Sequence, residues 1–337
     1  MQAVEFSLII PAYNEESVLN RFFEELEAGL NSWVHRPWEI IFVDDGSSDR
    51  TAEIILNKNA EDDRFKAVLL SRNFGQQPAV STGLSYAQGR FVGIIDADLQ
   101  DPIGVLRQMY EACREGRCNV AYGVRQKRQA PVVLDLSYKV FYRFMNRFSD
   151  HPWPVDAGDF CVLDRQTVNL LLQLPESSRI MRGLRSWIGL TQLAFPYRRP
   201  ARAAGESKYD MLRLTRLALD SMVSFSSAPL QFAVFCGLLA SLLCGFTTAL
   251  FILNRFFPSF TLFGYSVGAN PGVTTIVILV LLTSAFNFLC LGIMGQYLAL
   301  VVREVKRRPQ SIVREIVGDL QRNRVAFPTT RHESFFR

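Results

Sequence analysis

The chain has 337 residues, a formal net charge of +5 and 49% hydrophobic residues. The charge is small and the first 130 residues hold no dense run of Lys and Arg, so the composition argues against a nucleic-acid-binding protein. The apolar excess lies in the C-terminal part, where Ser221–Asn254 and Phe256–Val302 contain no charged residue.

The cysteines and the N-terminus bear on where the chain resides. The six cysteines form no CxxC pair, which favours reduced packing residues over a metal site or a disulfide framework. The N-terminal sequence MQAVEFSLIIP lacks a basic region and has only a short apolar stretch, so no signal peptide is predicted. We therefore expect the N-terminal domain to stay in the cytoplasm.

The first 125 residues alternate short apolar runs with segments of helical periodicity. Strands that alternate with helices form mostly parallel sheets covered on both faces, so this order predicts an α/β fold. We expect strands at Phe6–Ile10, Glu39–Val43, Phe65–Leu70, Phe91–Ile95 and Asn119–Tyr122, and helices at Glu16–Leu30, Thr51–Asn57, Pro78–Gln88 and Gly104–Cys113.

Two basic amphipathic helices are predicted next. In Tyr138–Phe148, Lys139, Arg143 and Arg147 recur every four residues, and apolar side chains fill another face. This pattern fits contact with a membrane or a lipid phosphate, and it fits a surface helix packed on the domain equally well. The second helix, Tyr209–Val223, leads directly into the first apolar run. We expect that helix at the membrane interface.

Two uncharged segments, Pro229–Leu253 and Val273 to about Met294, exceed the ~20 residues that cross a bilayer. Basic residues flank the pair on its outer sides, whereas the connecting loop carries only Arg255, so a hairpin with both ends in the cytoplasm is predicted. The predicted plan is an N-terminal domain at 1–207, an interfacial helix at 208–228, a transmembrane hairpin at 229–302 with spans at about 229–254 and 273–298, and a basic cytoplasmic tail at 303–337, helical from Ser311 to Leu320.

Polar clusters follow three of the predicted strands, and ligands of open parallel sheets bind at the carboxyl ends of the strands. Asp96-Ala97-Asp98 follows Phe91–Ile95, and two carboxylates at this spacing can share one divalent cation. Mg²⁺ prefers hard oxygen ligands, few protein carboxylates and substrate phosphates. The cluster therefore predicts a metal site that binds a diphosphate.

Asp44 and Asp45 follow a second strand, and Pro11–Glu15 follows the first. One of the two carboxylates can bind the ribose or base of a nucleotide, with the ring of Tyr13 nearby. A purely structural role, a turn that leads into a helix, accounts for part of the second cluster, because Ser48 or Asp49 can cap the next helix. The chain has no GxG and no GK[ST] sequence, so nucleotide binding is expected to use carboxylates and a metal.

The motifs PAYNE, VDDGSSDxT and DADLQDP occur in this order. With them the chain resembles the family 2 inverting glycosyltransferases of the GT-A fold, and more closely the polyprenyl-phosphate sugar transferases. The resemblance continues through Gly123-Val124-Arg125, Asp156–Phe160, Gly205–Tyr209 and the two apolar spans, and so covers nearly the whole chain. It implies a GT-A domain with a mostly parallel sheet, followed by amphipathic helices and two transmembrane helices.

The resemblance also implies roles for the matching residues. Those implied to hold the nucleotide sugar are Pro11, Tyr13, Glu15, Asp44, Asp45 and Asp96. The implied ligands of Mg²⁺ or Mn²⁺ are Asp96, Asp98 and Gln100. The acceptor phosphate or donor diphosphate would be bound by Arg125, Arg202, Ser207 and Lys208. The implied catalytic residues are Asp98, Asp156 and Asp159, and Asp156 or Asp159 would orient the sugar or act as a base.

The implied reaction is an in-line displacement with inversion, in which a polyprenyl phosphate oxygen attacks the anomeric carbon and the nucleoside diphosphate leaves. UDP-glucose and undecaprenyl phosphate are the favoured substrates, while GDP-mannose and UDP-4-deoxy-4-formamido-arabinose stay open as donors. The implied setting is the inner membrane, with the catalytic domain in the cytoplasm and the chain in a homo-oligomer such as a tetramer.

Other functional classes fit the sequence less well. A processive polysaccharide synthase would carry an RW dipeptide, which is absent. A catalytically silent scaffold would have lost Asp96 or Asp98, and two spans are few for a flippase. One departure concerns the transferase prediction itself: relatives often have Asp-Phe-Arg-Leu where this chain has Asp159-Phe160-Cys161-Val162. A contact near the acceptor or the sugar is therefore in question.

Overall fold

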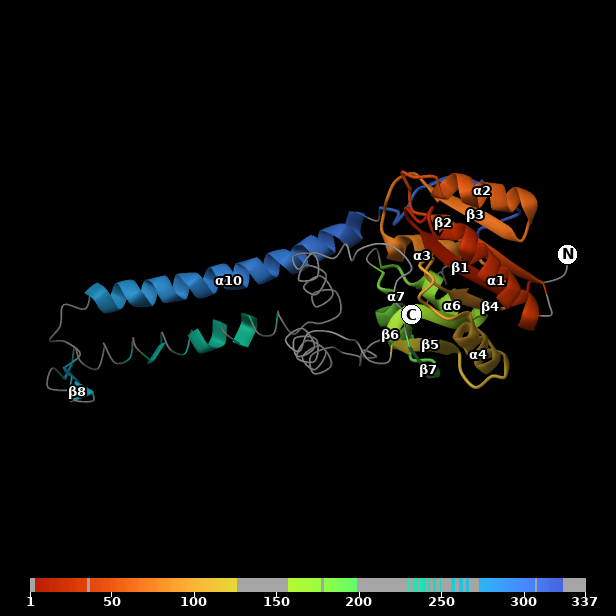
Figure 1. Cartoon of the computed structure of the whole chain (residues 1–337). Helices are drawn as coiled ribbons and strands as arrows, with labels where there is room; N and C mark the ends of the chain where they lie inside the picture. Colours follow the sequence, from red (N-terminus) through yellow and green to blue (C-terminus); the bar gives the residue numbers. More distant parts are fainter. Residues whose placement is uncertain are drawn as a thin grey trace, which may run out of the picture. The chain divides into compact units, whose positions relative to one another are not determined.

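The computed structural model describes residues 4–34, 37–125, 157–176, 179–198, 273–306 and 308–323, with scattered residues between 230 and 266. The chain forms two compact units. One comprises residues 1–146, 151–209 and 307–337, and the other comprises residues 147–150 and 210–306. The first unit contains a sheet with its helices, and the second contains the long helix α10 (Val273–Lys306) (Figure 1).

An eight-stranded sheet forms the centre of the first unit, in the order β10-β3-β2-β1-β4-β6-β5-β7. The strands are β1 (Phe6–Ala12), β2 (Trp38–Asp44), β3 (Phe65–Leu70), β4 (Phe91–Ile94), β5 (Val120–Arg125), β6 (Ala157–Asp164), β7 (Gln192–Tyr197) and β10 (Val313–Val317). The pairs β1–β2, β1–β4, β2–β3 and β5–β7 are parallel, whereas β6 and β10 pair antiparallel with their neighbours. The predicted α/β fold with a mostly parallel sheet is confirmed.

Helices cover both faces of the sheet (Figure 1). One face carries α1 (Leu19–Trp33), α2 (Thr51–Glu61) and α4 (Ile103–Arg114), and the other carries α3 (Gln76–Tyr86), α6 (Arg165–Gln173) and α7 (Met181–Ile188). The helical spacing of the large apolar residues in α1 explains its packing, because this face of the helix is buried: Leu19, Phe22, Phe23, Leu26, Leu30 and Trp33. Each such side chain stabilises the fold by roughly 1.5–3 kcal/mol.

The strands and helices predicted in the first 125 residues are all present, with ends that differ by a few residues. β1 runs through Pro11, whereas the strand predicted from the sequence ends at Ile10. Proline is accommodated because β4 pairs with β1 only as far as Ile9, so the missing N–H lies beyond that pairing. The prediction missed β6, α6, α7 and β7. Of these, β6 inserts between β4 and β5, a place that tertiary contacts decide.

The predicted helix from Ser311 to Leu320 is wrong. Val313–Val317 is the strand β10, which pairs antiparallel with β3 at the edge of the sheet. Its β-branched residues suit a strand, and the edge of β3 offers it a partner. Beyond the strand, the Asn323 N–H donates to the Ser85 carbonyl at 2.7 Å, so the segment continues past the sheet edge to α3.

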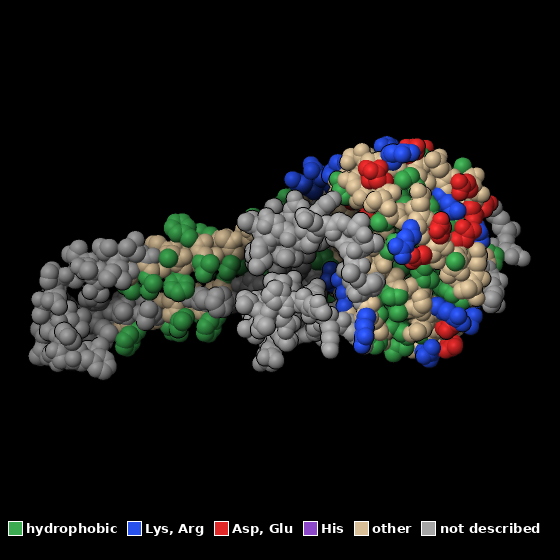
Figure 2. All heavy atoms as spheres, viewed as in Figure 1, with side chains coloured by type: hydrophobic (Ala, Val, Ile, Leu, Met, Phe, Trp, Pro, Cys, Tyr) green, Lys and Arg blue, Asp and Glu red, His purple; other side chains and the backbone are tan. Residues whose placement is uncertain are grey.

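Among the residues that the structure describes, one helical segment, Leu282–Lys306, is long and apolar enough to cross a membrane, by length and composition alone. It belongs to α10, at the position of the second predicted span. Many of its apolar side chains are exposed, including Phe288 at 75%, and Figure 2 shows hydrophobic side chains along this unit. The first predicted span lies mostly outside the described residues, and both predicted amphipathic helices lie wholly outside them.

We predict that β10 stabilises the first unit. A chain that ends at Pro309 leaves the buried strand β3 with an unpaired edge. We expect its midpoint of thermal unfolding to fall by roughly 5 °C in a scan in detergent. A chain that ends at Arg324 keeps β10 and is the control. Equal midpoints for the two chains would contradict the prediction.

Candidate functional site

Three loops leave the sheet at the same edge. β1 pairs with β2 so that Ala12 lies beside Asp44, and with β4 so that Ile9 lies beside Ile94. The residues that follow, 13–18, 45–50 and 95–102, therefore meet at the carboxyl edge of the parallel strands, where open α/β sheets bind ligands. The predicted convergence of the three motifs on one edge is confirmed.

Hydrogen bonds tie the first two loops together. The Asn14 N–H donates to Ser47 Oγ at 3.0 Å, and the Ser48 N–H donates to Asn14 Oδ1 at 2.9 Å. Asn14 has a φ of 55°, in the left-handed region that Asn tolerates better than most residues. Its neighbour Tyr13 is 41% exposed, so an aromatic face is available on a loop whose backbone is fixed.

The Asp45 carboxylate holds the start of α3. Asp45 is buried, Oδ1 accepts the Phe74 N–H at 2.7 Å, and Oδ2 accepts the Gly75 N–H at 2.8 Å. Burial raises the pKa of the Asp45 carboxyl, and these two hydrogen bonds partly oppose the rise. Asp44 is also buried and accepts the Ser47 N–H at 3.2 Å. Both carboxylates therefore organise loops of the site from beneath.

Two glutamines in the first turn of α3 reach the acidic residues of the site. Gln76 Nε2 donates to Asp96 Oδ1, and Gln77 Nε2 donates to Asp159 Oδ2, each at 2.7 Å. Gln77 Oε1 also accepts the N–H of Met181, the first residue of α7. Neither glutamine was predicted from the sequence to belong to the site. Their signal was available, because they are polar residues at a helix start that follows a strand end.

The Asp96 loop suits a divalent cation. Asp96 and Asp98 follow β4 directly, Asp98 Oδ1 accepts the Gln100 N–H at 3.2 Å, and Leu99 has a φ of 57°. Within the described ranges, no group of three or more His, Cys, Asp and Glu side chains is placed to hold a metal. Two carboxylates nevertheless fit Mg²⁺ or Mn²⁺, because these ions take their other oxygen ligands from substrate phosphates and water.

Arg125 extends the site beyond β4 and β6, because it is the last residue of β5, the next strand of the sheet. Its Nε donates to Tyr197 Oη at 3.4 Å, and Tyr197 Oη donates to Asp101 Oδ1 at 2.6 Å. Burial and Asp101 raise the pKa of Tyr197, so its hydroxyl keeps its proton. Burial would lower the pKa of Arg125, but Tyr197, Asp101 and Asp96 raise it overall. A fixed cation thus lies near the acidic loop.

The remaining predicted site residues divide into two groups. In the described part of the chain, Pro11 lies in β1, one residue before the strand ends. The Glu15 N–H donates to Thr51 Oγ1 at 2.8 Å, which ties the loop after β1 to the start of α2. Outside the described residues lie Asp156, Arg202, Ser207 and Lys208.

Cys161, where the resemblance leads one to expect an arginine, has a guanidinium beside it all the same. Cys161 is buried in β6, and the Arg185 side chain of α7 lies against it. Burial raises the pKa of the Cys161 thiol, and the positive charge of Arg185 partly opposes this. Arg185 was not singled out in the sequence, because no local pattern marks an arginine that helix packing will bury.

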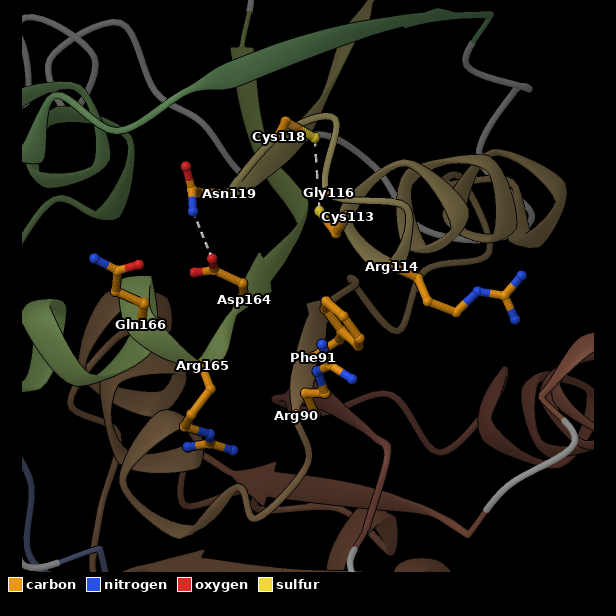
Figure 3. Close-up of a pocket in the computed structure, with 10 residues that line it drawn as sticks. All are labelled: Arg90, Phe91, Cys113, Arg114, Gly116, Cys118, Asn119, Asp164, Arg165 and Gln166. Atoms are coloured by element: carbon orange, nitrogen blue, oxygen red, sulfur yellow. Dashed lines mark hydrogen bonds between the residues drawn. The ribbon is translucent and has the colours of Figure 1, made fainter.

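A cavity of about 310 Å³ lies at the opposite edge of the sheet (Figure 3). It is bounded by the start of β4 at Phe91, the segment before β5 at Asn119 and the end of β6 at Asp164. Asn119 donates to Asp164 at 2.6 Å, and the nearby Arg165 donates to the Gly89 carbonyl at 2.9 Å. These polar groups bind each other and the backbone, so the cavity is not the candidate site.

Comparison with known proteins finds relatives along nearly the whole chain. Residues 7–171 match the model of glycosyl transferase family 2. The uncharacterized glycosyltransferase YkcC of Bacillus subtilis (strain 168) is 35% identical over 94% of this chain and 95% of its own length. The prophage bactoprenol glucosyl transferase homolog of Escherichia coli (strain K12) is 30% identical over 93% of this chain and 99% of its own length.

Among solved structures, glucosyl-3-phosphoglycerate synthase from Mycobacterium tuberculosis, in complex with Mn²⁺, UDP and glucosyl-3-phosphoglycerate, is 15% identical. The match covers 65% of this chain and 78% of that chain, with a TM-score of 0.44.

We predict that Gly46 is required for the second loop. Its φ is +68°, and a Cβ there would lie 2.4 Å from the Arg72 carbonyl carbon. Gly116 is the control, with a φ of +74° and nothing within 4 Å of its Cβ position. Gly116→Ala should lower the free energy of unfolding by about 1 kcal/mol, the left-handed backbone cost. Gly46→Ala adds a backbone clash and should cost roughly 3 kcal/mol. Similar losses in thermal unfolding would contradict the clash.

Proposed function

The chain belongs to glycosyl transferase family 2, and from this premise we propose that it transfers a sugar from a nucleotide donor to a polyprenyl phosphate, with inversion, at the cytoplasmic face of a membrane. It is a glycosyltransferase. The observation that carries the lipid-phosphate proposal is the pairing of an acidic loop, Asp96 to Asp98, with a fixed cation, Arg125, at one edge of the sheet.

The donor lies on the acidic side. The exposed ring of Tyr13 offers a face to the base, with Pro11, Glu15, Asp44 and Asp45 lining or supporting the nucleotide loop. Asp96 and Asp98, with Gln100 beside them, hold Mg²⁺ or Mn²⁺, which when bound stabilises negative charge on the leaving diphosphate. Asp159, fixed by Gln77, orients the sugar.

The acceptor lies on the basic side. Arg125 binds its phosphate, together with Arg202, Ser207 and Lys208, through charge-assisted hydrogen bonds. A phosphate monoester has a second pKa of about 6, so it is mostly dianionic at neutral pH and needs little help from a base. The main task of the protein is then to hold two anions close enough to react, and Asp156 or Asp159 has only a secondary part as a base.

The proposed acceptor is undecaprenyl phosphate and the proposed donor UDP-glucose. The relative named as a bactoprenol glucosyl transferase homolog, at 30% identity, supports both. GDP-mannose and UDP-4-deoxy-4-formamido-arabinose are the alternative donors for the same carboxylates. The exposed apolar side chains of α10 support a membrane anchor. We place the chain in the inner membrane with spans at about 229–254 and 273–298, as a homo-oligomer.

We predict that Asp98 is required for transfer. Purified protein in detergent receives undecaprenyl phosphate, Mg²⁺ or Mn²⁺ and a panel of radiolabelled nucleotide sugars, and label in the lipid phase is counted. One donor should label the lipid, chelation of the metal should stop transfer, and Asp98→Asn should slow it by roughly 10²–10³-fold.

The matched control is Asp63→Asn, which removes an exposed carboxylate beyond α2. Near wild-type transfer by Asp98→Asn with saturating metal would refute the metal assignment. No labelled lipid from any donor, with the protein folded, would refute the proposed reaction.

We predict that the two spans form a hairpin with both ends in the cytoplasm. Green fluorescent protein fused to the C-terminus should fluoresce, because this reporter fluoresces in the cytoplasm. Alkaline phosphatase fused after Gly268 should be active, because this enzyme is active only on the outer side of the inner membrane. An inactive phosphatase fusion, with the fusion protein present in membranes, would overturn the proposed topology.

A further inference from the structure

A buried arginine on α7 has no part in the reaction described so far. The Arg185 side chain is 2% exposed, and its Nη2 donates to the Gly158 carbonyl oxygen at 3.0 Å. Nε and Nη1 are buried as well, and neither has a hydrogen-bond partner among the described residues. None of the ion pairs between described residues includes Arg185. The guanidinium is therefore poorly compensated.

Stability alone does not account for such a group. Moving a charge out of water is costly unless hydrogen bonds or an opposite charge compensate it, and apolar residues of similar volume often replace buried charges with a gain in stability. Apart from the bond to Gly158, the Arg185 side chain contacts the Cys161 thiol and the Tyr122 ring, whose centroid is 5.8 Å from the guanidinium carbon, and neither group carries a full negative charge. A role for Arg185 is therefore to be found in the groups that its guanidinium holds in place.

Arg185 and Gln77 hold Asp159 from two sides. At the start of α7, the Met181 N–H donates to Gln77 Oε1 at 2.9 Å, and Gln77 Nε2 donates to Asp159 Oδ2 at 2.7 Å. One turn later, Arg185 binds the carbonyl of Gly158, the residue before Asp159. The side chain and the backbone of Asp159 are thus both tied to α7.

Asp159 lies at the edge of the candidate site. β4 ends at Ile94, which pairs with Cys161 of β6, so the residues before Cys161 run alongside the Asp96 loop. The first turn of α3 donates to both acidic residues, through Gln76 to Asp96 and through Gln77 to Asp159. A shift of Asp159 would therefore move a carboxylate on the side of the site where the donor is proposed to bind.

We propose that Arg185 is a positioning residue for sugar transfer, whose guanidinium fixes Gly158 and Asp159 beside Asp96 so that the Asp159 carboxylate orients the transferred sugar. This inference rests on the proposed function. Because the guanidinium is buried, it acts through Gly158 and Asp159 and not by touching the substrate. Misplacement of a group that orients a substrate by about 1 Å can slow a reaction by ~10²-fold, which sets the size of the expected effect.

The test is a double-mutant cycle with Arg185→Met and Asp159→Asn in the lipid-transfer assay, with thermal unfolding of each variant. Arg185→Met should lower kcat/KM for the donor by roughly 10²-fold. It should leave the KM for undecaprenyl phosphate within about twofold and the unfolding midpoint unchanged or raised. In the Asp159→Asn background the same substitution should add less than about threefold, because the two residues act as a unit.

Two further variants separate positioning from folding. Cys161→Arg/Arg185→Met returns a guanidinium from β6 to the same space and should recover much of the lost activity. Arg165→Met is the matched control, because Arg165 is a half-buried arginine at the opposite edge that binds the Ala87 and Gly89 carbonyls. It should lower the unfolding midpoint and leave donor kcat/KM unchanged.

The outcomes distinguish the inference from the function on which it rests. If the wild-type chain labels no lipid, the proposed function fails and the inference falls with it. If the wild-type chain is active and Arg185→Met matches it, only the inference fails. Loss of activity together with a lowered unfolding midpoint, no recovery by the double variant, or multiplying effects with Asp159→Asn would show a structural role and overturn the inference.

Discussion

The candidate site depends on one buried carboxylate, that of Asp45. It accepts the backbone N–H groups of Phe74 and Gly75, and so sets where α3 begins. The first two residues of α3, Gln76 and Gln77, then hold Asp96 and Asp159. A carboxylate that accepts two backbone hydrogen bonds in a buried place is rigid. Because Asp45 fixes the first turn of α3, it also fixes the glutamines of that turn that hold the acidic residues of the site.

Charge is arranged around this frame so that two anions can meet. The acidic loop after β4 suits a cation and a diphosphate, whereas Arg125 offers a fixed positive charge of its own. Tyr197 joins the two sides, since it donates to Asp101 in the acidic loop and accepts from Arg125. Phosphate and diphosphate repel each other. A glycosyltransferase that brings a phosphate to the sugar carbon from which a diphosphate leaves therefore needs positive charge on both sides of that carbon.

Sequence reasoning succeeded where the signal was local. The alternation of apolar runs and helical periodicity located the first nine elements, and the strand ends located the acidic motifs, because chain order alone brings parallel strand ends to one edge. It failed where a partner far along the chain decides the structure. Val313–Val317 is a strand because β3 has a free edge, and β6 lies between β4 and β5 although it follows both.

The sequence by itself determined the family, the α/β class and the residues of the acidic motifs, since motif order and hydrophobic period are properties of the chain. Only the tertiary structure decided how those residues are held. Gln76, Gln77 and Arg185 carry no motif, and their contacts with Asp96, Asp159 and Gly158 arise from the packing of α3 and α7 on one face of the sheet. Burial, the source of the raised pKa of Asp45, likewise exists only after the sheet has formed.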